Sequence, residues 1–138
     1  MLEKPNIEAE KKEKRRLRHN SLMLFRRWVK GLSDFGRCDN PDCKNPGVHS
    51  HHIVLRSQGG DNDKSNGLYL CAVCHHFAHN GVVQSAADRI GIDVCTAREF
   101  VIDILTARCN RSLVDNERWV FTLVELRSKT IAGTEVQG

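Results

Sequence analysis

The 138-residue sequence predicts an α+β domain, with a β-hairpin and a short helix at its centre and further helices on its N-terminal and C-terminal sides. Three observations lead to this expectation. Two short β-like runs are separated by a polar loop and followed by a short helical segment; two pairs of closely spaced cysteines accompany these runs; and amphipathic helical patterns flank them. The length is that of one domain, so a second catalytic domain is not expected.

Residues 1–30 are predicted to form a basic helical arm. Residues 7–30 have helical character, as one helix or as two helices broken near residues 19–21. The apolar stripe of the second part would consist of Leu22, Phe25, Trp28 and Val29. The arm has a net charge of +6, whereas residues 31–138 have a net charge of −2, and six of the eight residues from 11 to 18 are basic. This asymmetry favours a polyanionic partner such as nucleic acid, although a charged run is also typical of a solvated helix face.

Residues 31–81 are predicted to form the functional core. The partly β-branched run at residues 49–55 and the shorter run at residues 68–70 are predicted strands, and the polar segment 57–67 is the loop that joins them in a hairpin. Residues 72–80 are predicted to be a short helix that ends at Gly81, a residue type favoured just beyond a helix C-terminus.

Residues 82–138 are predicted to be an extension made of a helix, a strand and a frayed tail. Thr96 and Glu99 have the spacing of a capping box, which would open an amphipathic helix. The apolar face of this helix would be formed by Phe100, Val101, Ile104 and Leu105. The apolar run at residues 118–126 is predicted to be a strand, and residues 128–138 are predicted to be a frayed tail.

Four of the six cysteines form two closely spaced pairs, Cys38 with Cys43 and Cys71 with Cys74. The charged N-terminus does not resemble a secretory signal, so we expect a cytosolic protein with reduced thiols rather than a disulfide framework. Two such pairs are typical of a structural zinc site, because four thiolates complete the tetrahedral shell and leave no open position. Four independent buried thiols are the alternative. Cys95 and Cys109 are predicted to be ordinary buried residues.

Several classes of function are excluded by features that the sequence lacks. No apolar run approaches the roughly 18 residues of a membrane span, so no membrane association is expected. The absence of a P-loop and of a GxSxG motif argues against nucleotide-dependent and acyl-transfer chemistry. No glutamate occurs between Glu13 and Glu99, so the His-Glu motifs of zincins and zinc deaminases are absent too. A general base in the core must therefore be a His or an Asp.

Six of the seven histidines lie between residues 49 and 79. His51 and His52 are neighbours in a predicted strand, so their side chains should face opposite sides and serve different functions. His75 and His79 are four residues apart in the predicted helix, which puts them on one face at a spacing suited to joint metal coordination. His76 faces elsewhere. A lone histidine is more often structural, but a cluster beside paired cysteines favours a functional site.

The order and spacing of these residues resemble those of the HNH endonuclease family, and more narrowly the small zinc-knuckle HNH proteins common in bacteriophages. The resemblance covers about residues 24–81. The residues that carry it are His51, His52, Ile53, Val54, Ser57, Gln58, Gly59, Gly60, Asn66, Leu70, Cys71, Cys74, His75 and His79. The three residues that correspond to the family's name would be His52, Asn66 and His75. Residues from 82 onward match no motif.

The resemblance implies a ββα-metal finger that hydrolyses DNA phosphodiester bonds, nicking or cutting a duplex, with one divalent cation (Mg²⁺, Mn²⁺, Ni²⁺ or Zn²⁺). His52 would be the general base, and Asn66 would brace the loop and orient the His52 ring by a hydrogen bond. His51 and His75 would hold the cation, with His79 as a third ligand as in the toxin branch of the family. Many members have Asp at the position of His51, and an imidazole there shifts the preference from Mg²⁺ toward Zn²⁺, Ni²⁺ or Mn²⁺.

The resemblance also implies DNA, expected to be double-stranded, as the substrate, phage packaging or recombination proteins as partners, and the cytoplasm of a bacterial host as the location. The residues expected to contact DNA are Arg56, Arg26, Arg27 and Lys30, with the basic arm adding sequence-independent affinity. Ordinary solubilising charge is the alternative for each of them. Two other functions stay open: a non-catalytic zinc-stabilised module that binds nucleic acid, and a structural or protein-interaction domain held together by zinc.

Overall fold

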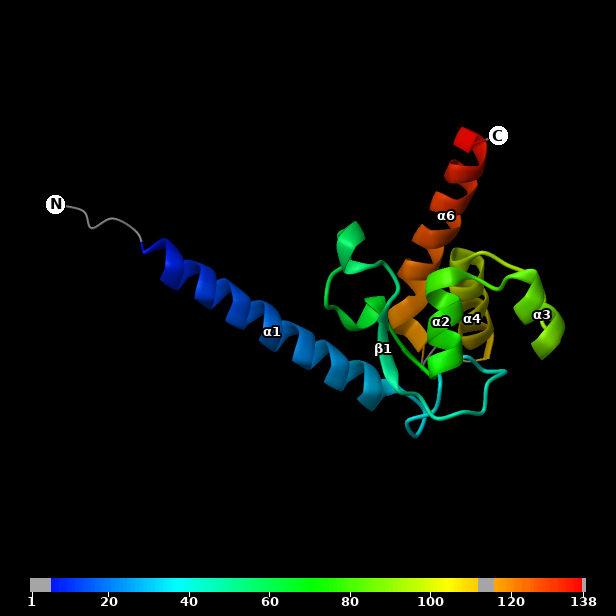
Figure 1. The fold of residues 1–138 in the computed structure, drawn as a ribbon, viewed down its shortest axis with the longest axis horizontal. Helices are drawn as coiled ribbons and strands as arrows, with labels where there is room; N and C mark the ends of the chain where they lie inside the picture. Colours follow the sequence, from blue (N-terminus) through cyan, green and yellow to red (C-terminus); the bar gives the residue numbers. More distant parts are fainter. Residues whose placement is uncertain (1–5, 112–115, 138) are drawn as a thin grey trace.

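The computed structural model describes residues 6–111 and 116–137, with side chains up to residue 128. A two-stranded antiparallel sheet lies at the centre, formed by β1 (His49–His52) and β2 (Gly67–Leu70). The sheet is followed by α2 (Ala72–Asn80), α3 (Gln84–Ile90), α4 (Ala97–Arg111) and α6 (Val120–Gln137). α1 (Ile7–Leu32) precedes it and projects away from the body of the molecule (Figure 1). The predicted α+β architecture, a hairpin and a short helix between flanking helices, is confirmed.

The hairpin is built so that the two faces of β2 meet different helices. β1 and β2 pair from His49 with Leu70 to His52 with Gly67. Because side chains alternate along a strand, Leu68 and Leu70 face one side and Tyr69 faces the other. Leu68 and Leu70 pack into the main core, whereas Tyr69 packs against α1.

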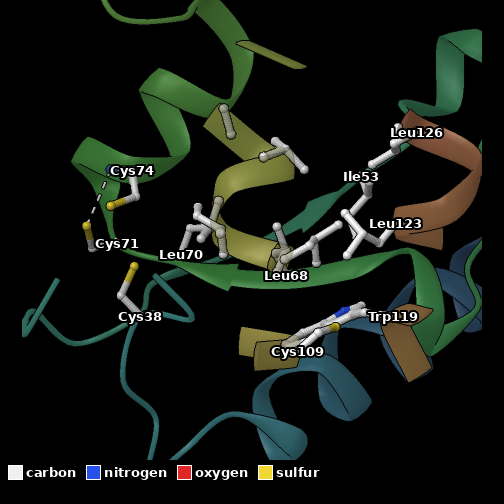
Figure 2. Close-up of a cluster of buried hydrophobic side chains, with 14 residues drawn as sticks. Cys38, Ile53, Leu68, Leu70, Cys71, Cys74, Cys109, Trp119, Leu123 and Leu126 are labelled. Atoms are coloured by element: carbon white, nitrogen blue, oxygen red, sulfur yellow. Dashed lines mark hydrogen bonds between the residues drawn. The ribbon is translucent and has the colours of Figure 1, made fainter. Parts of the chain in front are cut away.

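The main core lies between the hairpin, α2, α4 and α6 (Figure 2). Its buried apolar side chains outside the cysteines are Ile53, Leu68, Leu70, Ala78, Val101, Ile104, Leu105, Trp119, Leu123 and Leu126. Thr96 and Glu99 form the predicted capping box at the start of α4 through reciprocal side-chain to backbone hydrogen bonds of 3.1 and 3.2 Å. The predicted face of α4 is confirmed at Val101, Ile104 and Leu105, which are buried, and Phe100 is partly buried.

α1 is one continuous helix, and only its C-terminal part packs against the hairpin. Phe25 and Val29 are fully buried there, whereas Trp28 is 48% exposed, so its place in the predicted buried stripe is wrong. Gly67 explains the close approach of this helix to β2. A Cβ atom at Gly67 would lie 2.2 Å from Val29 Cγ2 and 2.9 Å from Phe25 Cε2, so a side chain there would displace the helix.

The segment predicted to be a C-terminal strand is helical, which corrects that prediction. A short 3-10 turn (Glu117–Trp119) leads into α6, and this helix continues to Gln137 through the segment predicted to be a frayed tail. Trp119, Leu123 and Leu126 recur at helical spacing and are buried against the hairpin and α4. The aromatic and β-branched residues that suggested a strand, Phe121 and Val124, are mostly exposed on the opposite side. None of the described helices is long and apolar enough to cross a bilayer.

Candidate active site and metal centres

The four paired cysteines come together at the N-terminal end of α2. Cys38 and Cys43 lie in the loop between α1 and β1, Cys71 is the N-cap of α2, and Cys74 is in its first turn. The four sulfur atoms all lie within 4.8 Å of one another, and those of Cys43 and Cys71 are 3.6 Å apart. Figure 2 shows the sulfurs of Cys38, Cys71 and Cys74 gathered at one place. All four are free thiols rather than disulfides.

The surroundings of these sulfurs fit a bound zinc ion. The side-chain amide of Asn40 donates to Cys74 Sγ at 3.5 Å, and the backbone N–H of Cys74 donates to Cys71 Sγ at 3.4 Å. The hydrogen bond with Cys74 is the main cause that lowers the pKa of the Cys38 thiol. Four converging sulfurs with donors directed at them have the chemical composition of a structural zinc site.

A buried charge next to the first cysteine links this cluster to the C-terminal helices. The Asp39 side chain is fully buried and accepts a 2.7 Å hydrogen bond from the backbone N–H of Tyr69 in β2. Arg118 lies 4.0 Å from the same carboxylate and stacks on the Trp119 ring at 4.0 Å from the ring centroid. Burial raises the pKa of Asp39 to about 6. Sequence reasoning missed this contact, because its partners lie about eighty residues apart in the chain.

Three histidines form a second cluster, farther along α2. His51 comes from β1, and His75 and His79 come from α2, where the i, i+4 spacing puts them on one face as predicted. One ring nitrogen from each lies within 4.8 Å of the others, and the Nε2 atoms of His75 and His79 are 3.1 Å apart. His51 is 2% exposed, and its Nδ1 atom is buried without a hydrogen-bond partner.

The protonation of these histidines fits a cation in their midst. Burial lowers the pKa of His51 to about 3 and that of His75 to about 4, with further lowering from the neighbouring imidazoles. Both rings are therefore neutral at neutral pH, and a neutral imidazole has a lone pair on one nitrogen that can bind a cation. Three neutral imidazoles, each with a ring nitrogen within 4.8 Å of the others, have the composition and spacing of three ligands of one cation.

His52 faces the other side of β1, as the strand alternation predicts. Its ring stacks on the Phe25 ring of α1, with the centroids 4.1 Å apart and the planes 13° apart. Its Nε2 atom lies 2.8 Å from the Oδ1 atom of Asn62 in the hairpin loop. The amide nitrogen of Asn62 in turn donates to the hydroxyl of Ser21 in α1 at 2.9 Å. Neither Asn62 nor Ser21 was predicted as a site residue.

Asn66 braces the hairpin loop and makes no hydrogen bond to the His52 ring. Its Oδ1 accepts a 2.7 Å hydrogen bond from the backbone N–H of Val54, and its Nδ2 donates to the carbonyls of Val54 and Asp61 at 3.0 Å each. The predicted hydrogen bond from Asn66 to His52 is therefore wrong. The physical reason is that the two N–H groups and the oxygen of the buried amide bind backbone groups of the loop that it holds.

A cavity of about 420 Å³ opens beside the three-histidine cluster. Its lining includes His51 and His79 of the cluster and Leu55 and Gln58 of the hairpin loop. Arg98, in the first turn of α4, also lines this cavity and supplies a positive charge near the cluster. No motif in the sequence pointed to Arg98, because it lies in the extension beyond the core.

Residues 36–81 match the family model of the HNH endonucleases. This segment forms an HNH endonuclease domain. HNH endonucleases are DNA-hydrolysing enzymes, and the matched segment contains both cysteine pairs, the hairpin and α2. No curated protein and no solved structure matches the chain.

The residues predicted to contact DNA lie on both sides of the HNH domain boundary. Arg56 begins the short 3-10 turn (Arg56–Gln58) in the hairpin loop of the domain and is exposed. Arg26, Arg27 and Lys30 belong to α1, before the start of the HNH domain, and all three are exposed. The backbone carbonyl of Arg26 accepts a hydrogen bond of 3.5 Å from the Ser50 hydroxyl, so this part of α1 lies against β1.

Proposed function

We propose that the protein is a metal-dependent endonuclease that hydrolyses phosphodiester bonds of duplex DNA. The observation that supports this most directly is the division of two neighbouring histidines between two environments. His51 lies in the cluster with His75 and His79. His52 faces α1, where its ring stacks on Phe25. Within the described part of the chain β1 pairs with β2 alone, so a phosphate at its other edge would have both faces of the strand within reach.

The chemistry assigned to the chain's own residues begins with His52. It accepts a proton from a water molecule whose oxygen attacks the phosphorus atom, the general-base task for which histidine is the most frequent side chain. The bond between phosphorus and the 3′ oxygen breaks, and that oxygen takes a proton from solvent. The products carry a 5′ phosphate and a 3′ hydroxyl. Asn66 acts by holding the loop that shapes this site.

His51, His75 and His79 would hold the divalent cation. When bound, the cation supplies electrostatic stabilisation of the negative charge that builds on the phosphoryl group and the leaving oxygen. Three imidazole ligands favour Zn²⁺, Ni²⁺ or Mn²⁺ over the hard Mg²⁺ ion, which prefers oxygen ligands. Arg98, at the edge of the adjoining cavity, would attract the phosphate by its charge.

Cys38, Cys43, Cys71 and Cys74 would bind a structural zinc ion. Two of these residues open α2, and two belong to the loop that precedes β1, so zinc would fasten the start of α2 to that loop. His75 follows Cys74 directly, so the same zinc would also set the position of the first helical histidine. Zinc binding is therefore expected to couple the fold to the catalytic site.

Binding to DNA would rest on α1 and on the hairpin loop. Arg26, Arg27, Lys30 and Arg56 are candidates for phosphate contacts, and the basic residues before them would add affinity without reading the base sequence. Phosphate contacts of this kind favour modest sequence specificity. Phage packaging or recombination proteins are the proposed partners, on the basis of the resemblance described above.

Relaxation of supercoiled plasmid tests this proposal. The protein is treated with EDTA and then supplied with Mg²⁺, Mn²⁺, Ni²⁺ or Zn²⁺. Its nicking rate is compared with those of the variants His52→Ala and His76→Ala. His76 is an exposed histidine on α2 that is outside the three-histidine cluster, so its variant is a matched control. We expect EDTA to abolish nicking and a softer cation to restore it best. Of the two variants, only His52→Ala should lose the nicking activity. If DNA ligase reseals the nicks without further treatment, the ends carry a 5′ phosphate and a 3′ hydroxyl. Specific binding to DNA without nicking under any cation would instead indicate a non-catalytic binding module.

A further inference from the structure

α1 meets the candidate general base from outside the HNH domain. Ser21 and Phe25 are four residues apart in α1, so both side chains lie on one face of the helix. That face is directed at His52: Phe25 stacks on its ring, and Ser21 accepts a hydrogen bond from Asn62, whose amide oxygen lies 2.8 Å from His52 Nε2. Both α1 residues precede residue 36, where the HNH domain begins.

The contacts restrain His52 in two independent ways. Phe25 is fully buried, and its nearly parallel ring fixes the plane of the imidazole. The hydrogen bond to Asn62 fixes the rotation of the imidazole within that plane. It also determines which nitrogen carries the proton, because an amide oxygen accepts a hydrogen bond and cannot donate one. With Asn62 Oδ1 facing Nε2, a neutral His52 ring would carry its proton on Nε2 and its lone pair on Nδ1.

We propose that Asn62, supported by Ser21 of α1, is the positioning residue that keeps His52 protonated on Nε2 and presents Nδ1 to the attacking water. This inference rests on the proposed function, in which His52 is the general base. In this inference Asn62, and not Asn66 as the resemblance implied, orients the His52 ring. It also makes α1 part of the catalytic apparatus from Ser21 onward, so the functional unit is longer than the matched HNH segment.

The proton that His52 accepts gives a further reason for this arrangement. After the transfer both ring nitrogens carry hydrogen, and each needs an acceptor. Asn62 Oδ1 already accepts from Nε2–H, so the ring does not have to move during the reaction. The reverse orientation of the amide would direct an NH₂ group at the protonated ring, which would oppose proton transfer.

The test combines nuclear magnetic resonance with kinetics on the full chain. Nitrogen chemical shifts distinguish the two neutral tautomers of a histidine, and a spectrum of His52→Ala identifies the resonances of His52. We expect the wild-type ring to be protonated on Nε2 and the Asn62→Ala ring to be a mixture of tautomers. Asn62→Ala should lower kcat by about 10- to 100-fold, the usual effect of losing an orienting partner, with little change in KM. Ser21→Ala should lower kcat less.

Two further variants keep the test specific. Asn62→Asp retains an oxygen acceptor, so the Nε2 tautomer and most of the kcat lost in Asn62→Ala should return. Asn20→Ala removes an exposed amide from the neighbouring position of α1 and should change neither the tautomer nor kcat. If Asn62→Ala does not fold, the wild-type tautomer of His52 and the kcat of Ser21→Ala test the positioning role of Asn62.

A wild-type ring protonated on Nδ1, or an Asn62→Ala protein with unchanged kcat and tautomer, would overturn the inference. These outcomes differ from failure of the proposed function, which would appear as a His52→Ala variant that nicks DNA as fast as the wild type. If His52→Ala abolishes nicking while Asn62→Ala does not affect it, the proposed function stands and only the positioning role is lost.

Discussion

The indole N–H of Trp119 donates a 3.0 Å hydrogen bond to the backbone carbonyl of Gly67, the first residue of β2. This bond joins the entry to α6 to the strand pair that holds His51 and His52. Trp119 is fully buried in the main core, and its ring also lies under the guanidinium of Arg118. The C-terminal extension therefore supports the HNH domain from outside its matched segment.

Trp119→Ala should strongly destabilise the protein. Removing this side chain leaves a large cavity, and it leaves the Gly67 carbonyl without its donor, so we expect a loss of about 3–5 kcal/mol in the free energy of unfolding. Urea denaturation followed by circular dichroism measures this loss. Phe121→Ala is the control, because Phe121 is 84% exposed and its removal should change stability by no more than about 0.5 kcal/mol. Equal effects from both variants would contradict the observed packing.

Cys71→Ser should release the structural zinc and disrupt the fold around α2. Cys71 is both a proposed zinc ligand and the N-cap of α2, and metal binding in sites of this type is coupled to folding. Elemental analysis should find one tightly bound zinc less per chain than in the wild type. Cys95→Ser is the matched control, since Cys95 lies outside the four-cysteine cluster. A wild-type protein that contains no tightly bound zinc and stays folded in a strong chelator would refute the zinc site.

Deletion of residues 1–18 should weaken DNA binding without abolishing cleavage at low salt. The deletion removes the densest run of basic residues but leaves Ser21 and Phe25 beside His52. Fewer counterions are released on binding, so the plot of log Kd against log salt concentration should become flatter. Fluorescence anisotropy with a labelled duplex gives both the affinity and the slope. Complete loss of nicking at low salt, with the fold intact, would show that the deleted segment belongs to the active site.

His51→Asp should change the cation preference of the nuclease. A carboxylate is a harder ligand than an imidazole, so the variant should gain activity with Mg²⁺ relative to Zn²⁺ or Ni²⁺. Nicking rates across the four cations, each measured at saturation, give the ratio for the wild type and for the variant. An unchanged ratio would place residue 51 outside the cation site. The same substitution at exposed His76 should leave the ratio as it is in the wild type.

Sequence patterns predicted the hairpin, α2, the two cysteine pairs and the shared face of His75 and His79, because these depend on short-range spacing. The place of His51 beside those two histidines was implied by the resemblance to the HNH family. The cysteine pairs and the i, i+4 histidines are separated by a few residues within turns or within one helix, so their geometry follows from local structure. The strand alternation likewise separated His51 from His52. Asn62 was missed because its partners, Ser21 and His52, come from α1 and β1, and only tertiary packing brings those elements together.

The run at residues 118–126 was mistaken for a strand because it is apolar and contains several aromatic and β-branched residues. The helical spacing of Trp119, Leu123 and Leu126 was also present in the sequence, but the composition of the run outweighed it. Packing decides between the two patterns, because the helical spacing brings Trp119, Leu123 and Leu126 together in the core formed with the hairpin and α4. Local propensity could not supply that information.

The nicking rate as a function of cation concentration, for the wild type, His51→Ala and His52→Ala, tests the central claim most directly. With the base removed and the cation ligands intact, His52→Ala should be slower by about 10²–10⁴-fold at every cation concentration. His51→Ala should require more cation, and excess cation should restore part of its rate, because two imidazole ligands remain. Calorimetric titration should show unchanged cation affinity for His52→Ala and weaker affinity for His51→Ala. Rescue of His52→Ala by excess cation, with no rescue of His51→Ala, would contradict the account by reversing the two roles.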